Sequence, residues 1–335
     1  MSIDHGLIEA LTKYLDRPKL KLAPLKWDGS DRTYYRISAP DEEPSQVLML
    51  LGDSDRQKLR ENRYDWVHIQ KDLADSQFRV PAIQGILPEK GALIIEDLGN
   101  TSLQALHEAK DKNATELYRQ SFKMLGGLIQ LNPQGTIWSQ RAFDLDKLHS
   151  ELMFLNQHLL EPFNLVSSQE KELFIQETKN LAESISHSSK YFCHRDFHSR
   201  NLMVLPNGSL GIIDFQDARL GPATYDLVSL VFDSYVDLSK EIRLGFIKEA
   251  INILSKGAPN EDLESQWPLV LLQRQLKALG SFGYLSLHLK RGDYLQYVPS
   301  AANILAEHTK HLEQSWPFLV GDLIPRICVK HDWKL

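Results

Sequence analysis

Three oxygen-bearing side chains near the middle of the chain have the types and spacing for one kind of chemistry. Asp196 is followed five positions later by Asn201, and Asp214 comes after a further, mostly apolar stretch. Amide and carboxylate oxygens suit Mg²⁺, which takes one or two protein ligands and fills its other positions with water and substrate phosphate. A further carboxylate beside such an ion can face an acceptor hydroxyl. The set therefore predicts phosphoryl transfer, a reaction that depends on positioning and on neutralising charge.

The residues between Asn201 and Asp214 predict a β-hairpin that brings these two side chains together. Two apolar runs, 202–205 and 210–213, flank Pro206-Asn207-Gly208-Ser209. Asn-Gly between such runs is the strongest short-range signal for a two-residue type I′ turn. With Asn-Gly as the turn, Asn201 lies directly opposite Asp214, and directly opposed residues have Cβ atoms about 5 Å apart. One Mg²⁺ could then be held between the amide and the carboxylate.

The order of these residues is similar to that of a known catalytic segment. His194-Arg195-Asp196, four residues, Asn201, an apolar hairpin and then Asp214-Phe215 resemble the catalytic and metal-binding loops of the eukaryotic-like kinases. The metal motif continues as Gln216-Asp217 and is therefore not D-F-G. Together with the segment 221–227 it resembles the aminoglycoside phosphotransferase and choline kinase branch. The resemblance implies that Asp226, on a following helix, braces the loop, with His194 as further structural support.

A purely structural interpretation of these residues is also open. His194 and Asp196 could be ordinary turn residues, while Asn201 and Asp214 could cap strand ends. Five residue types at matched spacing, with a hairpin that independently brings two of them together, favour the catalytic interpretation.

Composition sets the broad class of the protein. The 335 residues are enough for two domains of the usual size, about 100 to 200 residues each. With 38 Lys plus Arg against 44 Asp plus Glu, the net charge of −6 argues against nucleic acid as the main partner. Two cysteines suggest no disulfide framework, and neither a signal peptide nor a membrane span is evident. We expect a cytoplasmic protein with a small-molecule partner and no membrane contact; its oligomeric state is not indicated.

The elements that must position the site fall into two groups. Residues 1–97 predict a small α+β domain that binds the nucleotide, and residues 98–335 predict a mainly helical domain with the catalytic loop, the metal site and the acceptor site. The first domain has expected helices over 3–15 and, from Ser54, over 54–74, and expected strands over 20–27, 33–38, 46–51 and 91–95, with Pro24 marking an edge strand. Expected helices of the second are 102–110, 114–132, 143–160, 167–186, 225–238, 267–287 and 299–315.

Two segments of the first domain are candidates for binding ATP. The polar turn Asp28-Gly29-Ser30-Asp31-Arg32 could contact phosphates through its N–H groups and Ser30 Oγ, as a kinase glycine-rich loop does, although most such turns are only turns. The strand that ends at Glu96-Asp97-Leu98 resembles the kinase hinge, where backbone groups pair with adenine. It also has the form of an ordinary central strand that ends in a turn. The nucleotide-binding candidates are Gly29, Ser30, Asp31, Arg32, Glu96 and Leu98.

One expected residue is missing from the third strand. Kinases carry a phosphate-pairing lysine there, whereas residues 47–51 read Val-Leu-Met-Leu-Leu, with Met49 near the expected position. Either another cation replaces this lysine or the chain is an inactive nucleotide-binding scaffold. Arg32 and Arg36 are the nearest candidates, because a guanidinium can make a fork-like contact with phosphate oxygens.

A further segment narrows the resemblance. Residues 273–283, Gln-Arg-Gln-Leu-Lys-Ala-Leu-Gly-Ser-Phe-Gly, together with residues 28–32, 96–98 and 196–201, resemble the bacterial anomeric kinases of N-acetylmuramate and N-acetylglucosamine. The resemblance implies a bilobal protein-kinase-like fold and an ATP- and Mg²⁺-dependent amino-sugar 1-kinase of cell-wall recycling. His198 and Arg200 could contact the acceptor or the phosphate, or could merely brace the loop. The same motifs would serve an aminoglycoside or choline kinase.

Overall fold

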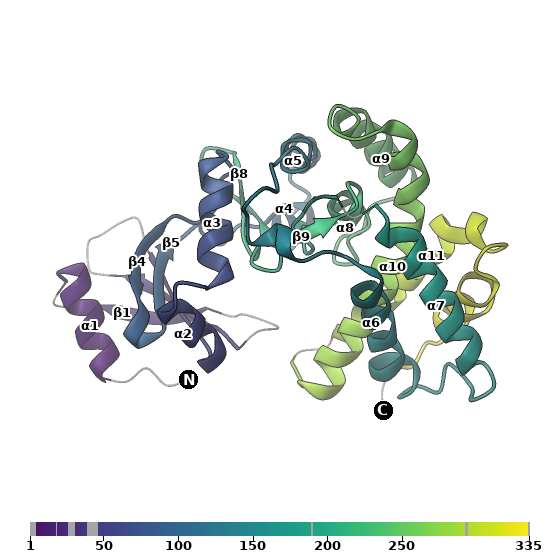
Figure 1. The fold of residues 1–335 in the computed structure, drawn as a ribbon, viewed down its shortest axis with the longest axis horizontal. Helices are drawn as coiled ribbons and strands as arrows, with labels where there is room; N and C mark the ends of the chain where they lie inside the picture. The colour runs from purple at the N-terminus through teal and green to yellow at the C-terminus, as the bar shows by residue number, and fades with distance from the viewer. Residues whose placement is uncertain are drawn as a thin grey trace. The chain divides into compact units, whose positions relative to one another are not determined.

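The computed structural model describes residues 5–17, 19–25, 31–38, 46–188, 190–291 and 294–333. The chain divides into two compact units, Met1–Asn100 with Met203–Gln216, and Thr101–Leu202 with Asp217–Leu335 (Figure 1). A small antiparallel sheet forms the first, and the second is mainly helical, which confirms the predicted α+β class. The division differs from the predicted domains 1–97 and 98–335, because the first unit runs to Asn100 and also includes the hairpin of residues 203–216.

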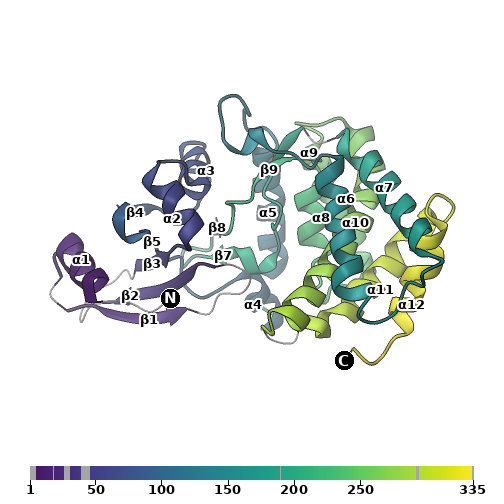
Figure 2. The same cartoon turned by 60° about the horizontal axis from the view of Figure 1, so that its bottom comes forward.

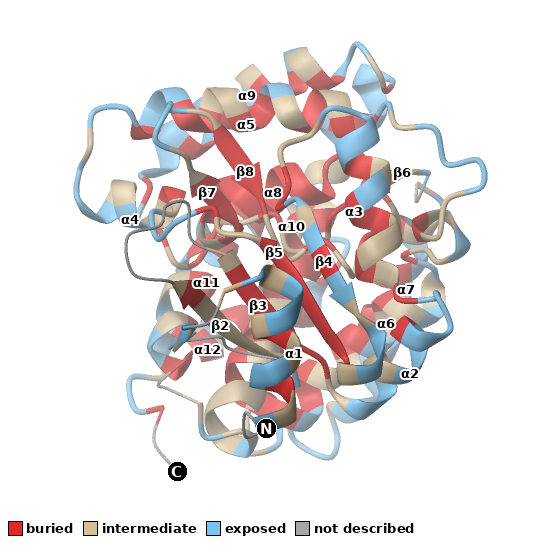
Figure 3. Ribbon diagram, turned by 90° about the vertical axis from the view of Figure 1, so that its left-hand side faces the viewer, coloured by how far each residue is buried: buried red, intermediate tan, exposed pale blue. Residues whose placement is uncertain are grey.

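The sheet of the first unit is antiparallel throughout. Its strands are β1 (Lys21–Leu25), β2 (Thr33–Ser38), β3 (Gln46–Leu50), β4 (Ile83–Leu87) and β5 (Ala92–Glu96), in the order β1-β2-β3-β5-β4. Pro24 lies on the edge strand β1, as predicted. Proline has no N–H to donate to a neighbouring strand, and an edge strand has a neighbour on one side only. Leu48 and Ile94 pair across β3 and β5 in the core, and α1 (His5–Leu15) adds Leu7 and Leu11 to the same cluster. Figure 3 shows buried residues along the central strands of the sheet.

The helix predicted over residues 54–74 is two helices. α2 (Asp53–Arg60) ends in a turn in which Arg63 N–H donates to Lys58 C=O at 2.7 Å and Asn62 has φ +52°, and α3 (Asp65–Asp75) begins afterwards. Asparagine tolerates this left-handed conformation better than most residues, which ends the helix there. The N-cap is Gly52 and not Ser54.

The hairpin strands β7 (Leu202–Val204) and β8 (Leu210–Ile212) pair, but not through the predicted turn. Leu205 N–H donates to Ser209 C=O at 2.9 Å, Gly208 N–H donates to Leu205 C=O at 2.8 Å, and Gly208 has φ +79°. This is a three-residue loop, a type I turn followed by a bulge. The predicted two-residue turn would need an N–H at position 206, and Pro206 has none.

The change of turn shifts the strand register by one residue. The ladder places Leu202 opposite Ile212 and ends there, while Asn201 closes a short 3₁₀ helix, Ser199–Asn201. Asn201 and Asp214 are therefore not a cross-strand pair, and that premise of the sequence argument is wrong. The hairpin lies against its own unit: Ile212 N–H donates to Arg79 C=O at 2.8 Å, and a Cβ on Gly211 would come within 2.7 Å of Leu98.

The α-helices described in the second unit are α4 (Leu103–Glu108), α5 (Ala114–Leu128), α6 (Leu145–Leu155), α7 (Lys171–Ser186), α8 (Tyr225–Val231), α9 (Lys240–Leu254), α10 (Asn260–Gly283), α11 (Val298–Thr309) and α12 (Ile324–Val329). Several of them, α6, α7, α8, α9 and α11, pack around α10 (Figure 2). α10 begins earlier and α8 ends earlier than predicted. Two short strands that the sequence analysis did not predict, β6 (Tyr191–Cys193) and β9 (Arg219–Gly221), pair antiparallel.

Two glycines let α10 cross α6 and its π-helical continuation, Asn156–Leu160, at close range. A Cβ on Gly280 would lie 2.7 Å from Leu155 Cα, and one on Gly283 would overlap the carbonyl oxygen of His158. Only glycine permits this approach of two backbones. This close approach fixes the rotation of α10 about its axis, and with it the direction in which residues 273–277 point. In the described part of the chain, no helix combines the length and the apolar character needed to cross a membrane.

Candidate active site

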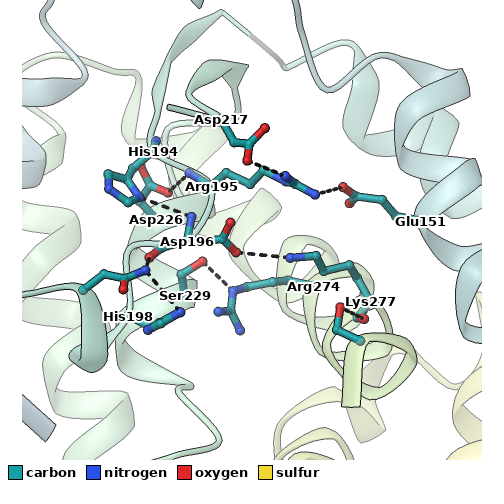
Figure 4. Close-up of polar contacts among 12 residues, drawn as sticks. Glu151, His194, Arg195, Asp196, His198, Asp217, Asp226, Ser229, Arg274 and Lys277 are labelled. Carbon is teal, nitrogen blue, oxygen red and sulfur yellow. Dashed lines mark hydrogen bonds and ion pairs between the residues drawn. The ribbon is translucent and has the colours of Figure 1, made fainter. Parts of the chain in front are cut away.

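The loop of residues 194–201 leaves β6 and is held by a buried carboxylate of α8. Asp226 Oδ2 accepts from His194 N–H at 2.6 Å, and Oδ1 accepts from Arg195 N–H at 2.9 Å (Figure 4). The side chain of His194 is fully buried, and its Nδ1 accepts from Asp196 N–H at 3.3 Å. Burial raises the pKa of Asp226, although these N–H groups oppose the rise. These contacts attach the start of the loop to α8.

A second buried carboxylate, Asp233, holds the other end of the loop. Its Oδ2 accepts from the backbone N–H of Ser199 at 3.0 Å and from the Ser199 hydroxyl at 2.5 Å, and its Oδ1 accepts from Tyr235 N–H at 2.9 Å. α8 therefore stops at Val231 instead of continuing to 238, because the chain turns to present Asp233 to the loop. Sequence analysis missed this residue. The only available signal was its spacing of seven residues from Asp226, two turns along an expected helix.

Arg195 links the loop to two further acidic residues. Its Nη2 lies 3.2 Å from Glu151 Oε1, and its Nη1 lies 3.5 Å from Asp217 Oδ2. Glu151 is buried on α6 and also accepts from Gln273 of α10 at 3.2 Å. The backbone of Arg195 has φ +81°, an unfavourable conformation for this residue that its surroundings must hold in place.

Asp196 carries the carboxylate that can face an acceptor. Its Oδ1 lies 3.2 Å from Nζ of Lys277 on α10, and its side chain is 26% exposed. Burial works to raise the pKa of Asp196, but the charges of Lys277 and Arg195 outweigh it and hold the pKa well below the usual carboxyl range. The Asp196 carboxylate therefore stays ionised. Such a group is a weak base and a strong hydrogen-bond acceptor.

Lys277 and Arg274 lie at the loop and not on a solvated helix face. Arg274 is buried and its Nε donates to Ser229 Oγ at 2.5 Å, while Lys277, one turn further along α10, pairs with Asp196 (Figure 4). The sequence offered their spacing of three residues and the glycines that follow them, but gave no sign that this face of α10 points inward.

Asn201 and His198 complete the loop. Asn201 Nδ2 donates to the carbonyl oxygen of Asp196 at 2.9 Å and lies 3.4 Å from His198 Nε2. The first contact fixes the amide orientation, so the amide oxygen of Asn201 points away from the donors of its own loop. Burial lowers the pKa of His198 to about 4, so its imidazole is neutral at pH 7. Because Nε2 faces an amide donor, Nδ1 carries the proton, and it has no hydrogen-bond partner among the described residues.

Asp214 follows β8 in the first unit. Its backbone has φ +65°, and Gln216 Nε2 donates to its Oδ1 at 2.7 Å. Arg32 of the same unit interacts with Asp214, and its Nε lies 3.8 Å from Asp55 Oδ2. Burial works to lower the pKa of Arg32, but nearby Tyr34, Tyr64 and Asp214 raise it overall. A guanidinium thus lies near the aspartate of the predicted metal motif.

The other candidate cation, Arg36, is paired with a carboxylate. Its Nε and Nη2 contact both carboxylate oxygens of Asp97 at 2.5 and 3.0 Å, and Nη2 also donates to Asn100 Oδ1 at 2.9 Å. The guanidinium therefore fixes the segment that follows β5.

Glu96 and Leu98 lie where the hinge-like segment was predicted. The carboxylate of Glu96 pairs with the guanidinium of Arg79 and accepts from Ala82 N–H at 3.2 Å, and Arg79 lowers its pKa. Leu98 is buried against Gly211. Both side chains are thus engaged with protein. Asp31 is exposed, while Gly29 and Ser30 lie outside the described residues.

The sheet, the helical unit and the loop define a kinase-like phosphotransferase fold. An aminoglycoside phosphotransferase solved with ADP bound matches with a TM-score of 0.60 at 17% identity, covering 92% of this chain and 99% of that one. A choline kinase from Streptococcus pneumoniae matches with a TM-score of 0.59 at 14% identity, covering 91% and 100%. At these identities the likeness shows the fold. The model of the phosphotransferase enzyme family matches residues 21–259, and the chain belongs to that family.

Curated relatives cover most of the chain. The N-acetylmuramate/N-acetylglucosamine kinase of Neisseria meningitidis serogroup B is 26% identical over 309 residues, 88% of this chain and 89% of that protein. The protein of the same name from Pseudomonas aeruginosa is 29% identical over 297 residues, 84% and 82%. The chain is therefore a kinase that transfers a phosphoryl group to an alcohol group of a small molecule.

Proposed function

We propose that the protein is an ATP-dependent amino-sugar kinase that transfers the γ-phosphoryl group to the anomeric hydroxyl of N-acetylmuramate, N-acetylglucosamine or both. The observation that carries the proposal is the ionised Asp196 carboxylate, held by Lys277 on a loop braced at both ends. An anomeric hydroxyl is more acidic than an ordinary alcohol, so it suits a weakly basic partner. The names of the curated relatives support the acceptor, and the proposed setting is cell-wall recycling in the cytoplasm.

Asp196 would orient the acceptor instead of deprotonating it early. Phosphoryl transfer has a loose transition state in most analyses, so the hydroxyl keeps its proton until the bond to phosphorus is largely formed. A carboxylate with a low pKa accepts a hydrogen bond from that hydroxyl and aims its oxygen at the phosphorus. It takes the proton only late, as the oxygen becomes acidic. Lys277 holds the carboxylate in position throughout.

Mg²⁺ fits the oxygen donors that the chain offers. Asn201 has a fixed amide whose oxygen is not used within its loop, and Asp214 supplies a carboxylate. Hard oxygen ligands of this kind, few in number, suit Mg²⁺. When bound, the ion would neutralise charge on the phosphates of ATP. Asn201 and Asp214 would hold it, with adenine at the backbone of residues 96–98 and phosphates at the turn of residues 28–32, including Gly29, Ser30, Asp31 and Arg32.

We expect Arg32 to replace the missing strand lysine. Met49 is buried opposite Tyr34 in the sheet, and Arg32 is the cation that lies near Asp214, whereas Arg36 is paired with Asp97. Arg32→Ala should raise the KM for ATP and lower kcat by about tenfold or more, because a charge-assisted phosphate contact is lost. Steady-state kinetics with ATP varied would measure this. Lys13→Ala, an exposed position on α1, is the control; unchanged ATP kinetics in Arg32→Ala would remove it as a candidate.

A panel of acceptors tests the function itself. Purified protein with ATP and Mg²⁺ is assayed for ADP release with N-acetylmuramate, N-acetylglucosamine, choline and kanamycin. Turnover with either amino sugar, and a product that has lost its reducing end, supports the proposal. Turnover with kanamycin or choline alone would reject the sugar and retain the kinase. ATP binding without turnover of any acceptor would favour a nucleotide-binding scaffold.

A further inference from the structure

Arg200 lies in an aromatic cluster at the end of the catalytic loop. Its guanidinium carbon lies 3.5 Å from the ring centre of Tyr235 and 5.2 Å from that of Tyr297. The rings of Tyr235 and Tyr297 stand at right angles, 4.8 Å apart, and Phe282 of α10 packs against both. All these residues belong to the second unit. The contacts hold a cation in one orientation.

Two hydrogen bonds fix the guanidinium further and leave one end of it open. Nε donates to Gln104 Oε1 at 2.8 Å, and Nη2 donates to the Tyr297 hydroxyl at 2.8 Å. Within the described part of the chain, no group accepts from Nη1. No carboxylate pairs with Arg200 among the described residues either, whereas the neighbouring Arg195 has two. A guanidinium stays protonated in proteins. The cation is therefore rigid, charged and without an anionic partner.

His198 lies beside the aromatic cluster that holds this cation and is close enough to the Asp196 carboxylate to interact with it electrostatically. The ring of His198 packs edge-on against Tyr235 at 5.5 Å, and His198 interacts with the charge of Asp196. The Nδ1–H of His198 is the buried donor without a partner described above. An acceptor held at Asp196 would thus lie near the buried Nδ1 of His198, which has no partner among the described residues, and then near a stacked guanidinium.

We propose that Arg200 is a specificity-determining residue that binds a carboxylate on the acceptor, so that the site selects amino sugars carrying an acidic side group. The inference rests on the proposed function and deepens it. N-acetylmuramate and N-acetylglucosamine differ by a lactyl ether, whose carboxylate can make two charge-assisted hydrogen bonds with a guanidinium. Stacking on Tyr235 prepares the guanidinium for that contact, because it restricts the side chain before the ligand arrives.

The test compares the two sugars in wild type and in Arg200→Met. We expect the ratio of kcat/KM for N-acetylmuramate to that for N-acetylglucosamine to fall roughly 10- to 100-fold. Arg200→Lys keeps the charge without the fork and should lower the ratio less. Arg326→Met is the matched control, because Arg326 also lies over an aromatic ring, Phe318, and pairs with Glu170. The ratio should not change in it.

Two other outcomes of this comparison would contradict the proposal. If kcat/KM for both sugars falls in parallel and the thermal midpoint drops, Arg200 only braces the loop. If the ratio is unchanged and the KM for ATP rises, the anion is a phosphate of the donor. If Arg200→Met does not fold, Tyr297→Phe, which removes the hydroxyl that Nη2 contacts, must lower the ratio for the proposal to survive. If wild type turns over neither sugar, the proposed function fails. Calorimetric binding of N-acetylmuramate that is lost in Arg200→Met and only weakened in Arg200→Lys would then support the inference, and no binding to wild type would overturn it.

Discussion

Asp196→Asn should lower kcat by about 10³-fold, with a much smaller change in the KM for ATP. The substitution keeps the size of the side chain and its contact with Lys277, but removes the charge and the capacity to take the proton of the acceptor. The loss should appear in kcat because the interaction with the hydroxyl strengthens as its proton becomes acidic. Steady-state kinetics with the best acceptor of the panel, and a melting curve to show that the variant is folded, would measure it.

The pH profile provides the control for this result. The pKa of Asp196 is lowered, so its carboxylate stays ionised as the pH falls. Protonation of Asp196 should therefore not reduce wild-type activity in the pH range in which ordinary carboxyl groups titrate. Lys277→Met removes the cation that lies 3.2 Å away and leaves burial, which raises the pKa. The acidic limb of the kcat profile should therefore move to higher pH. An acidic limb at the same pH in both proteins, or an active Asp196→Asn, would contradict the assigned role.

Asp214→Asn should lower kcat by about 10²- to 10³-fold and raise the Mg²⁺ concentration needed for half-maximal rate. The carboxylate would lose the charge that balances the metal. Asparagine is the right replacement because position 214 has φ +65°, which asparagine tolerates and alanine does not. A change in rate would then come from the ligand and not from the backbone. Kinetics with Mg²⁺ varied at fixed ATP would measure both effects.

Asp217→Asn is the matched control for the metal ligand. Asp217 belongs to the same Asp-Phe-Gln-Asp segment, but its carboxylate contacts Arg195 at 3.5 Å and is 44% exposed. It should change the rate much less and should not change the Mg²⁺ dependence. If Asp214→Asn responds to Mg²⁺ as wild type does, Asp214 is not a metal ligand. If the Mg²⁺ dependence changes in Asp217→Asn and not in Asp214→Asn, the assignment of the two aspartates must be exchanged.

The sequence alone predicted the fold class, most strands of the sheet and the identity of the loop. Alternating and helical periodicities report which residues are buried, and they do so locally, so β2, the edge position of Pro24 and the α+β class followed from them. The hairpin was also a local prediction, but its turn was wrong. The prediction gave more weight to the Asn-Gly signal than to the missing N–H of Pro206. Because Pro206 cannot donate a hydrogen bond, the loop has three residues and the strand register shifts by one residue.

What the sequence by itself determined about this protein is therefore its set of chemical groups: Asp196, Asn201 and Asp214 at spacings that suit phosphoryl transfer. Only the tertiary structure decided how those groups behave. Lys277 reaches Asp196 across 81 positions of chain, and Asp233 reaches Ser199 across 34. A pKa depends on charges within a few ångströms in space, and sequence spacing does not reveal which distant helix supplies them. For the same reason, only the fold showed that Arg36 is paired and that Arg200 is held on aromatic rings.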